Sequence, residues 1–498
     1  MAIRNLALST ILACAGLLGF LALVNNGRAE VLASPPEATA VSTTHYVAPG
    51  GDWAGGYPCY ATVQAAVDAA VAGDEIRVAA GTYTGTESDV LLVEETVTIR
   101  GGYTATNWAT ADPEMNPTIL DGEGARRVIH VAGEITVVLE GLTVTRGFAS
   151  EGGGILVEDA IVTLERDTID ANQAMVGFMG SAYGGGVSLR DSTVNLIRSA
   201  VSGNFLGGSR GGGGGLYAVN SSVNLLNTYV TGNQVFVNGG KSGGLYVRNC
   251  DAVHITGSEV TTNSADFGGG LYASGSDVAV TASLVRDNDS FWGGGIYLDG
   301  GTADLARDVF KANDAFEDGG GLYLRDVNAT LVNTVVIDNV ADGRGSGLYS
   351  ESSSPTLVHA TLARNSGQAG SAIHVSGGMP VLTNVVVVGH VVGITVTGTS
   401  DVAVHGVLWY SNTQANVAPA GAITVTDAVT GSPGFAGDGY HLTGESAAVD
   451  RGVTTDLLMD IDQQPRFGLP DLGADELWLP GLIDRLFLPV VTGNVAAW

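Results

Sequence analysis

Carboxylates recur in four successive short stretches of the chain, and the first three of these stretches also contain aromatic side chains. They are Asp266, Phe267, Asp289, Phe291, Trp292, Asp314, Phe316, Asp318 and Asp342. A polysaccharide site combines aromatic rings, which pack on sugar faces, with polar groups that orient the hydroxyls, so this composition favours glycan binding. The same carboxylates offer the oxygen ligands that Ca²⁺ requires. The structural alternative is that the Phe rings fold back over the turns as a small additional core.

A column of tyrosines recurs at one position of a repeat. It consists of Tyr217, Tyr246, Tyr272, Tyr297, Tyr323 and Tyr349, and it continues to His374. Each Tyr lies between two small or apolar residues, so in a strand its side chain points to the opposite face. Stacked rings stabilise neighbouring strands, and they also offer a platform for sugar faces. We therefore include Tyr272, Tyr297 and Tyr323 among the candidate ligand-binding residues.

The repeat that carries these residues has a fixed body and one variable segment. Its last Gly-like residue is Gly154, Gly186, Gly215, Gly244, Gly270, Gly295, Gly321, Gly347 and Ala372. An Asn follows eighteen residues later, or nineteen in one repeat, and the last step ends at His390. From each Asn to the next Gly the spacing falls from fourteen residues to seven or eight. Variation confined to one loop is typical of a solenoid.

The body of the repeat reads as strands. Apolar residues alternate with period two, as in Leu271 and Ala273, and recur in three columns. A repeat of about 25 residues is too short for a strand–helix–strand unit. The pattern therefore predicts an all-β parallel β-helix, in which each strand pairs with its equivalent in the next coil. The recurrent Asn either occupies a left-handed bend or forms a hydrogen-bonded ladder.

Two short motifs resemble those of known secreted solenoids. Gly293-Gly294-Gly295-Ile296 and Val285-Arg286-Asp287-Asn288 are examples. They resemble the GGAI and FxxN repeats of polymorphic outer membrane proteins and the wider group of right-handed parallel β-helix repeat proteins. The resemblance implies a right-handed parallel β-helix of about 10–12 coils over residues 76–430.

The N-terminal part predicts export and a cap. Residues 1–29 contain a basic residue followed by an apolar run, which indicates a signal peptide or a retained N-terminal anchor. Residues 45–85 read as an N-terminal cap. Within them, Ala61–Gly73 places four residues on one helical face, namely Val63, Ala66, Val67 and Ala70, so we expect a short helix over the first coil.

The C-terminal part resembles a surface-protein module. Tyr440-His441-Leu442 and Asp471-Leu472-Gly473-Ala474-Asp475-Glu476 resemble the choice-of-anchor Q domain, which implies a C-terminal cap over 431–478. Asp460, Asp462 and Asp471 could hold a structural Ca²⁺ there, or pair with Arg466. The apolar tail, 479–498, adds a closing strand or serves as a sorting signal.

Charge excludes several partners. The formal net charge is −29 and the chain has two lysines, Lys241 and Lys311, so we expect no nucleic-acid partner. Membrane contact would come only through an uncleaved N-terminal segment, and we expect a monomer. No cofactor is implied apart from a structural Ca²⁺.

These features predict an exported protein, extracellular or at the surface of a bacterium. We expect adhesion, glycan or matrix binding, or scaffolding, without catalysis. The alternative is a carbohydrate-active enzyme, a lyase or hydrolase of acidic polysaccharide. A lyase would require a basic residue near the substrate carboxylate. Arg286 lies in an Asp-rich stretch, but the same position of other repeats holds Thr261, Lys311 or Ile337, which disfavours a catalytic role for it.

Overall fold

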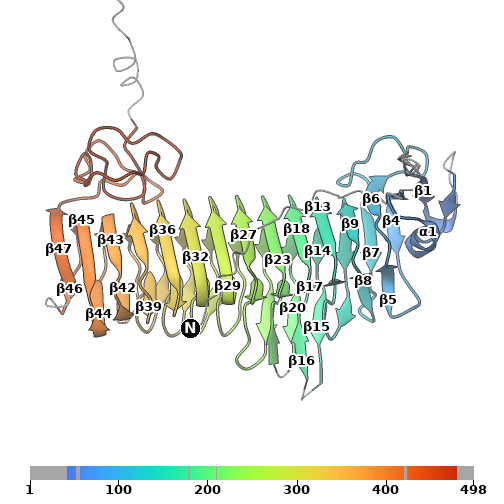
Figure 1. Cartoon of the computed structure of the whole chain (residues 1–498), viewed down its shortest axis with the longest axis horizontal. Coiled ribbons are helices and arrows are strands. Elements are labelled where there is room, and N and C mark those ends of the chain that lie inside the picture. The colour runs from blue at the N-terminus through green and yellow to red at the C-terminus, as the bar shows by residue number, and fades with distance from the viewer. Residues whose placement is uncertain are drawn as a thin grey trace, which may run out of the picture. The chain divides into compact units, whose positions relative to one another are not determined.

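The computed structural model describes residues 42–51, 57–177, 180–208, 210–368, 370–419 and 423–478. Within them the chain is an all-β parallel solenoid of about 13 turns, with one short α-helix near the N-terminus. Figure 1 shows the strands of successive turns lying side by side. The prediction of a right-handed parallel β-helix is confirmed. The predicted signal segment, 1–29, and the apolar tail, 479–498, lie outside the described residues.

The strands form three rows, A, B and C, in which each strand pairs in parallel with its equivalent in the next turn. Row A contains β5 (Asp89–Val93), β8 (Arg127–Ala132), β12 (Ile155–Glu158), β17 (Val187–Arg190), β22 (Leu216–Val219), β26 (Leu245–Arg248), the first parts of β29 (Leu271–Thr281) and β32 (Ile296–Ala306), β35 (Leu322–Arg325), β39 (Leu348–Glu351), β42 (Ser371–Gly378), β44 (Val392–Ser400) and β46 (Ala415–Ala418).

Row B contains β1 (Thr44–Val47), β3 (Glu75–Ala79), β6 (Thr98–Tyr103), β9 (Thr136–Glu140), β13 (Ile161–Glu165), β18 (Thr193–Ile197), β23 (Ser222–Leu226), β27 (Ala252–Thr256), the later parts of β29 and β32, β36 (Asn328–Val332), β40 (Thr356–Val358), and the first parts of β43 (Val381–Val388), β45 (Val402–Tyr410) and β47 (Ile423–Thr430). The short strand β2 (Cys59–Tyr60) also pairs with β1.

Row C contains β4 (Gly81–Tyr83), β7 (Thr118–Asp121), β10 (Leu142–Thr145), β14 (Thr168–Asp170), β19 (Ala200–Ser202), β24 (Tyr229–Thr231), β28 (Glu259–Thr261), β30 (Leu284–Arg286), β33 (Val309–Lys311), β37 (Val335–Ile337), β41 (Thr361–Ala363), and the later parts of β43, β45 and β47. The register keeps the columns of the repeat aligned, as in Leu271↔Ile296 and Val285↔Phe310.

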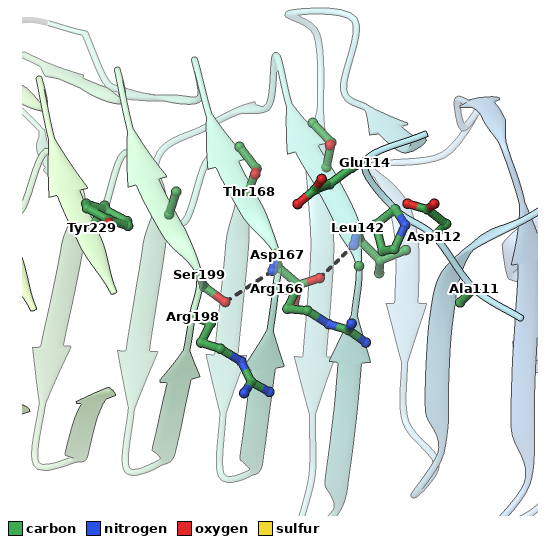
Figure 2. Close-up of a pocket in the computed structure, with 14 residues that line it drawn as sticks. Ala111, Asp112, Glu114, Leu142, Arg166, Asp167, Thr168, Arg198, Ser199 and Tyr229 are labelled. Carbon is green, nitrogen blue, oxygen red and sulfur yellow. Dashed lines mark hydrogen bonds between the residues drawn. The ribbon is translucent and has the colours of Figure 1, made fainter. Parts of the chain in front are cut away.

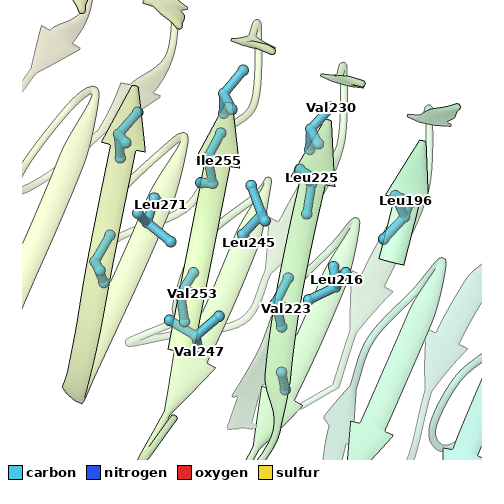
Figure 3. Close-up of a cluster of buried hydrophobic side chains, with 14 of the residues drawn as sticks. Leu196, Leu216, Val223, Leu225, Val230, Leu245, Val247, Val253, Ile255 and Leu271 are labelled. Carbon is cyan, nitrogen blue, oxygen red and sulfur yellow. The ribbon is translucent and has the colours of Figure 1, made fainter. Parts of the chain in front are cut away.

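The inward side chains of the three rows form one continuous apolar core. Figure 3 shows part of it, where Leu245 and Val247 of row A lie near Val253 and Ile255 of row B. Each of these side chains is at most 1% exposed. Since burial of one such side chain contributes about 1.5–3 kcal/mol, the stack is held mainly by this core.

The recurrent Asn residues form a buried ladder. The Nδ2 of Asn288 donates to Oδ1 of Asn313 in the next turn, at 2.9 Å, and to the carbonyl oxygen of Val260, at 2.9 Å. The same pattern runs from Asn172 to Asn365, where His390 continues it. Positive φ belongs to the residue before Asn288, Asp287. The ladder alternative is therefore confirmed, and the left-handed bend lies one residue earlier.

The glycines before row A allow turns to approach closely. A Cβ on Gly294 would lie 2.5 Å from the carbonyl oxygens of Asp314 and Gly320. A Cβ on Gly295 would lie 2.5 Å from the carbonyl oxygen of Gly321 and 3.1 Å from the amide of Asn313. The Gly-Gly pair and the Asn therefore belong to one packing unit.

Several of the variable segments form short side strands. One sheet contains β11 (Phe148–Ala149), β15 (Gln173–Met175), β20 (Phe205–Gly207) and β25 (Gln234–Phe236), and another contains β31 (Asp289–Ser290), β34 (Asp314–Ala315) and β38 (Val340–Ala341). The longest segments add a pair, β16 (Ser181–Tyr183) and β21 (Arg210–Gly212).

The N-terminal helix is α1 (Val63–Ala69), preceded by the 3₁₀ turn η1 (Pro49–Gly51). Thr62 caps it by accepting a hydrogen bond from the amide of Ala65. Its buried residues are Val63, Ala66 and Val67, and they join the core of the first turns. The predicted helix is therefore present, shorter than Ala61–Gly73.

Residues 431–478 pack against the outward side of row C. Their buried residues Leu442, Ala448, Ile461, Leu472 and Ala474 cluster with Val335, Ile337, Ala363, Val386, Val388 and Leu408. Arg466 donates to Oδ1 of Asn333 at 2.8 Å, and Asn384 accepts from the amide of Val453 at 2.7 Å. The segment that we predicted as a cap thus lies along the side of the last turns.

Candidate functional site

A groove lies where the variable segments change from long to short. Its lining includes Phe236, Val237 and Asn238 from the longer segment, and Asp289 and Phe316 from the shorter ones. The space measures about 740 Å³. We call it the loop groove. The Asn-to-Gly spacing falls from eleven residues after Asn233 to seven after Asn263, and the groove lies where the segment length changes.

Three phenylalanine rings are exposed in the loop groove. Phe236 is 67% exposed, Phe291 is 44% exposed and Phe316 is 59% exposed. Phe291 and Phe316 lie edge to face, with their ring centroids 5.3 Å apart. Phe236 stacks on Phe205 at 5.7 Å. The groove therefore offers two separate aromatic surfaces to solvent, rather than rings folded into the protein.

Carboxylates line the same groove. Asp266 and Asp289 belong to its lining. Asp266 accepts a hydrogen bond from the amide of Gly239 at 2.6 Å, which fixes its position. Asp289 pairs in register with Asp314 of the next turn. Partial burial, together with the charges of Asp289 and Asp342, raises the pKa of Asp314 above its ordinary value. The acidic residues are thus close enough to interact.

The comparison with protein families identifies the architecture. The model of the right-handed β-helix region matches residues 153–332 and 237–408, which together span more than half of the chain. The chain belongs to the right-handed β-helix family. No curated protein matches it.

Three solved structures are similar to this right-handed β-helix protein in fold alone. Pectate lyase Pel9A is 14% identical, over 88% of this chain and 97% of that chain, with a TM-score of 0.38. Tailspike protein 3 of bacteriophage CBA120 is 12% identical, over 77% of this chain and 61% of that chain, with a TM-score of 0.44. The catalytic domain of a GH87 α-1,3-glucanase in complex with nigerose is 11% identical, over 79% of this chain and 70% of that chain, with a TM-score of 0.24.

The tyrosine column of the β-helix is covered. Tyr272, Tyr297 and Tyr323 are 4%, 2% and 7% exposed. Their rings contact one another, with centroids 5.1 Å apart for Tyr272–Tyr297 and 4.3 Å apart for Tyr297–Tyr323. Burial raises the pKa of Tyr297 to about 12. These tyrosines point out of the coil, as predicted, but the variable segments cover their rings.

Phe267 and Trp292 provide that cover. They stack at 4.7 Å, and Phe267 also packs edge to face on Tyr297 at 5.7 Å. The amine of Lys241 lies 3.4 Å from the centre of the Phe267 ring, and burial lowers its pKa to about 8. Phe267 and Trp292 are half-buried and line no part of the loop groove.

Two further predicted residues lie beyond the groove. Asp318 is 7% exposed and pairs with Arg344 at 2.7 Å. Asp342 is exposed near Asp314. The structure therefore brings Asp266, Asp289, Phe291 and Phe316 together in the groove, places Asp314 and Asp342 beside them, and leaves the other predicted residues in supporting positions.

The three acidic residues predicted near the C-terminus have different surroundings. Asp460 accepts hydrogen bonds from the amides of Asp462, Gln464 and Glu476. Asp471 accepts from the amides of Asp450 and Leu477. Both carboxylates thus organise the backbone of 431–478.

Asp462 instead belongs to a group with a histidine. Its Oδ2 lies 2.6 Å from Nε2 of His441, and these residues form with Asp475 a group whose ligand atoms lie within 4.8 Å of one another. The carboxylates of Asp438 and Asp462 raise the pKa of His441, against the opposing effect of burial. Arg466 pairs with Glu476 at 3.1 Å. The structural Ca²⁺ site expected at Asp460, Asp462 and Asp471 stays a prediction.

The outward face of row C carries residues that the sequence reasoning missed. Figure 2 shows a pocket there, with Arg166, Arg198 and Tyr229 around it. Tyr229 is 53% exposed. Arg166 pairs with Glu140, and Arg198 pairs with Glu165. Each Arg lies six residues before an Asn of the repeat, and that shared offset is the signal that could have identified them.

Within the part of the chain that the structure describes, no helix has the length and apolar character needed to cross a membrane.

Proposed function

We propose that this β-helix protein is exported and binds glycan through the loop groove, as an extracellular or cell-surface adhesin or matrix-binding protein of a bacterium. The observation that carries the proposal is the exposure of Phe236, Phe291 and Phe316 beside Asp266 and Asp289. Apolar rings that gather in one exposed patch are typical of an interaction site, and rings flanked by hydrogen-bond acceptors match the apolar face and the hydroxyl groups of a sugar.

The spacing of the rings supports an extended ligand. Phe236 lies two turns before Phe291, and neighbouring turns of a parallel stack are about 4.8 Å apart. The two aromatic surfaces are therefore about 10 Å apart along the stack. We propose a glycan of several units that contacts both surfaces, with its hydroxyls donating to the carboxylates between them.

We propose that export and attachment depend on the two ends of the chain. The basic and apolar pattern of 1–29 supports export, and the motifs of 431–478 that resemble the choice-of-anchor Q domain support a place at the cell surface. A Ca²⁺ bound by Asp289, Asp314 and Asp342 is compatible with the interaction of these carboxylates.

The enzyme alternative has one observation in its favour. Lys241 has a pKa lowered to about 8 by burial, so a substantial fraction of its amine is neutral at mildly alkaline pH. However, its amine lies under the Phe267 and Tyr272 rings, 3.4 and 4.6 Å from their centres. We interpret Lys241 as a cation–π contact that holds the aromatic cover in place.

A glycan array followed by titration tests the proposal. We expect Phe291→Ala and Phe316→Ala each to weaken binding of the best glycan by about five- to tenfold, because one aromatic contact contributes roughly 1–1.5 kcal/mol. Tyr410→Ala is the matched control, since Tyr410 is 43% exposed and lies far along the chain in β45. Unchanged affinity in both Phe variants would contradict the groove.

A second measurement separates binding from catalysis. We expect incubation with pectin, alginate and glycosaminoglycans to give neither unsaturated products at 235 nm nor new reducing ends. Turnover that Lys241→Met abolishes would instead favour a polysaccharide lyase.

A further inference from the structure

A second pocket lies between row C and residues 431–478. Strands β28, β30 and β33 and the turns before them form one side, and Tyr440, Ile461 and Asp462 form the other. The space measures about 700 Å³. We call it the lateral pocket. It shares no residue with the loop groove.

Three cations converge on the lateral pocket. They are Arg286, Arg307 and Lys311, in a chain whose 22 basic residues are outnumbered by 51 acidic ones. Arg286 and Lys311 are register partners on neighbouring strands and point to the same outward face. Two like charges in such a pair destabilise a sheet. The placement of Lys311, one of only two lysines, beside Arg286 therefore has a cost that a bound anion would offset.

The three cations differ in how far the protein itself neutralises them. Arg286 pairs with Asp287 at 2.5 Å and approaches Glu259 at 3.8 Å. Arg307 and Lys311 form no ion pair and no side-chain hydrogen bond with any of the residues that the structure describes. Both side chains are half-buried at the pocket. Two positive charges are thus available to a ligand.

The remaining lining suits a polar ligand larger than a bare anion. Tyr440 contributes an aromatic ring, and the carboxylates of Glu259 and Asp287 can accept hydrogen bonds from hydroxyl groups. Asp462 is already engaged by His441. A simple oxyanion would fill only a small part of the space. A lining with both signs of charge also suits a ligand that carries one anionic group among several hydroxyls.

We propose that the lateral pocket binds an acidic sugar unit, with Arg307 and Lys311 holding its carboxylate or sulfate group. Charge-assisted hydrogen bonds from these two side chains provide the recognition. The hydroxyls of the sugar donate to Glu259 and Asp287, and the Tyr440 ring packs beside it. The net charge of −29 opposes the approach of a long polyanion, so the site favours a short or sparsely charged saccharide.

Titration calorimetry of the full chain tests this site. The probes are a galacturonate trisaccharide, its methyl-esterified form, a sulfated disaccharide and inorganic sulfate. We expect the acidic saccharides to bind, and Arg307→Gln and Lys311→Gln each to weaken them about tenfold or more. Arg248→Gln is the control, because Arg248 is exposed and also unpaired among the described residues. Thermal unfolding of each variant checks that it folds.

The outcomes separate the sources of the anion and the two sites. If the methyl-esterified trisaccharide bound as tightly as the galacturonate trisaccharide, the proposed role of the negative charge would be wrong. If inorganic sulfate bound as tightly as the sulfated disaccharide, the pocket would recognise an oxyanion and the proposed contacts with the sugar would be wrong. Unchanged affinity in Arg307→Gln and Lys311→Gln, or no binding by any acidic saccharide, would overturn the site. Phe291→Ala should leave this binding unchanged, so failure here is distinguishable from failure of the loop groove.

Discussion

At the scale of single residues, two aspartates occupy positions that hold a buried Ser or Thr in other turns of the β-helix. Ser199, Thr228, Ser258, Ser283 and Thr334 lie at the turn between rows B and C, where Asp167 and Asp308 occupy equivalent positions. The Ser283 hydroxyl donates to the carbonyl oxygen two residues earlier, that of Thr281, at 3.0 Å. Among the residues that the structure describes, the Oδ2 atoms of Asp167 and Asp308 have no hydrogen-bond partner. A protonated carboxyl would reproduce the hydroxyl's donation.

The surroundings of Asp308 support this protonated form. Its side chain is fully buried, and its Oδ1 accepts from the amide of Ser283 at 2.9 Å. Burial raises the pKa of Asp308 to about 8. Since an unfolded Asp titrates near pH 4, the folded state binds the proton more tightly. The stability that this proton contributes is complete below about pH 4 and is lost as the pH rises through about 8.

We predict that Asp308→Asn stabilises the protein at pH 8. The amide keeps the acceptor and supplies the missing donor without a charge, so the gain should be on the order of a few kcal/mol. The gain should disappear near pH 4, where the wild-type carboxyl is protonated. Thermal unfolding between pH 4 and 8 measures this. Asp304→Asn, at an exposed position four residues earlier, should change little. A gain that does not depend on pH would refute the assignment.

At the scale of structural elements, the turn before row A is limited by backbone contact. The Cβ that an alanine would add at Gly294 would lie 2.5 Å from two carbonyl oxygens, one of them in the next turn. Backbone cannot yield as a flexible side chain can, so neighbouring turns must separate. The glycine runs therefore set the distance between turns at this corner, while the Asn ladder sets their register.

We predict that Gly294→Ala destabilises the β-helix by about 1–3 kcal/mol, the usual cost of overpacking, and by more if turns separate along the stack. Gly444→Ala is the control, because a Cβ on Gly444 meets nothing within 4 Å. Denaturant unfolding of both variants measures the difference. If the two variants were equally stable, a Cβ at position 294 would be tolerated, and the inference that backbone contact limits this turn would be wrong.

Sequence patterns predicted the rows because the repeat itself encodes them. Period-two alternation at Leu271 and Ala273, and the fixed offset from Gly to Asn, are consequences of in-register stacking. The same logic predicted that Tyr297 points outward. It did not predict burial of that ring, because the cover comes from Phe267 and Trp292 in segments that obey no period. Phe291 and Phe316 were predicted as site residues because they occur in successive variable segments that stack in register. Phe236, which also lines the loop groove, was not predicted.

At the scale of the whole molecule, the decisive contacts join segments far apart in sequence. Row C has an outward face that is polar near β14 and apolar at β37 and β41, where Val335, Ile337 and Ala363 are all buried. Residues 431–478 cover that apolar part. No local pattern identifies which turns this segment meets, so neither its lateral position nor the lateral pocket beside it could be read from the sequence.

We predict that a chain ending at Thr430 keeps its early turns and loses the protection of its late ones. Removal of Leu442, Ile461 and Leu472 exposes the outer apolar side of row C, and it leaves the ring of His359 without its 3.3 Å partner at the carbonyl of Gly473. Because each turn of a solenoid is stabilised mainly by its neighbours, the damage should remain local.

Hydrogen exchange followed by mass spectrometry distinguishes this local effect. Amides of β37, β41 and β43 should exchange faster in the shortened chain by at least tenfold, while those of β9, β10 and β13 should be unchanged, because those strands lie at least three turns before β28, which contacts the lateral pocket. Leu469→Ala in the full chain is the control, since Leu469 is 53% exposed within the same segment. If β37 and β41 kept their protection after the truncation, residues 431–478 would be an appendage, and the lateral pocket would lack its second wall as a stable feature.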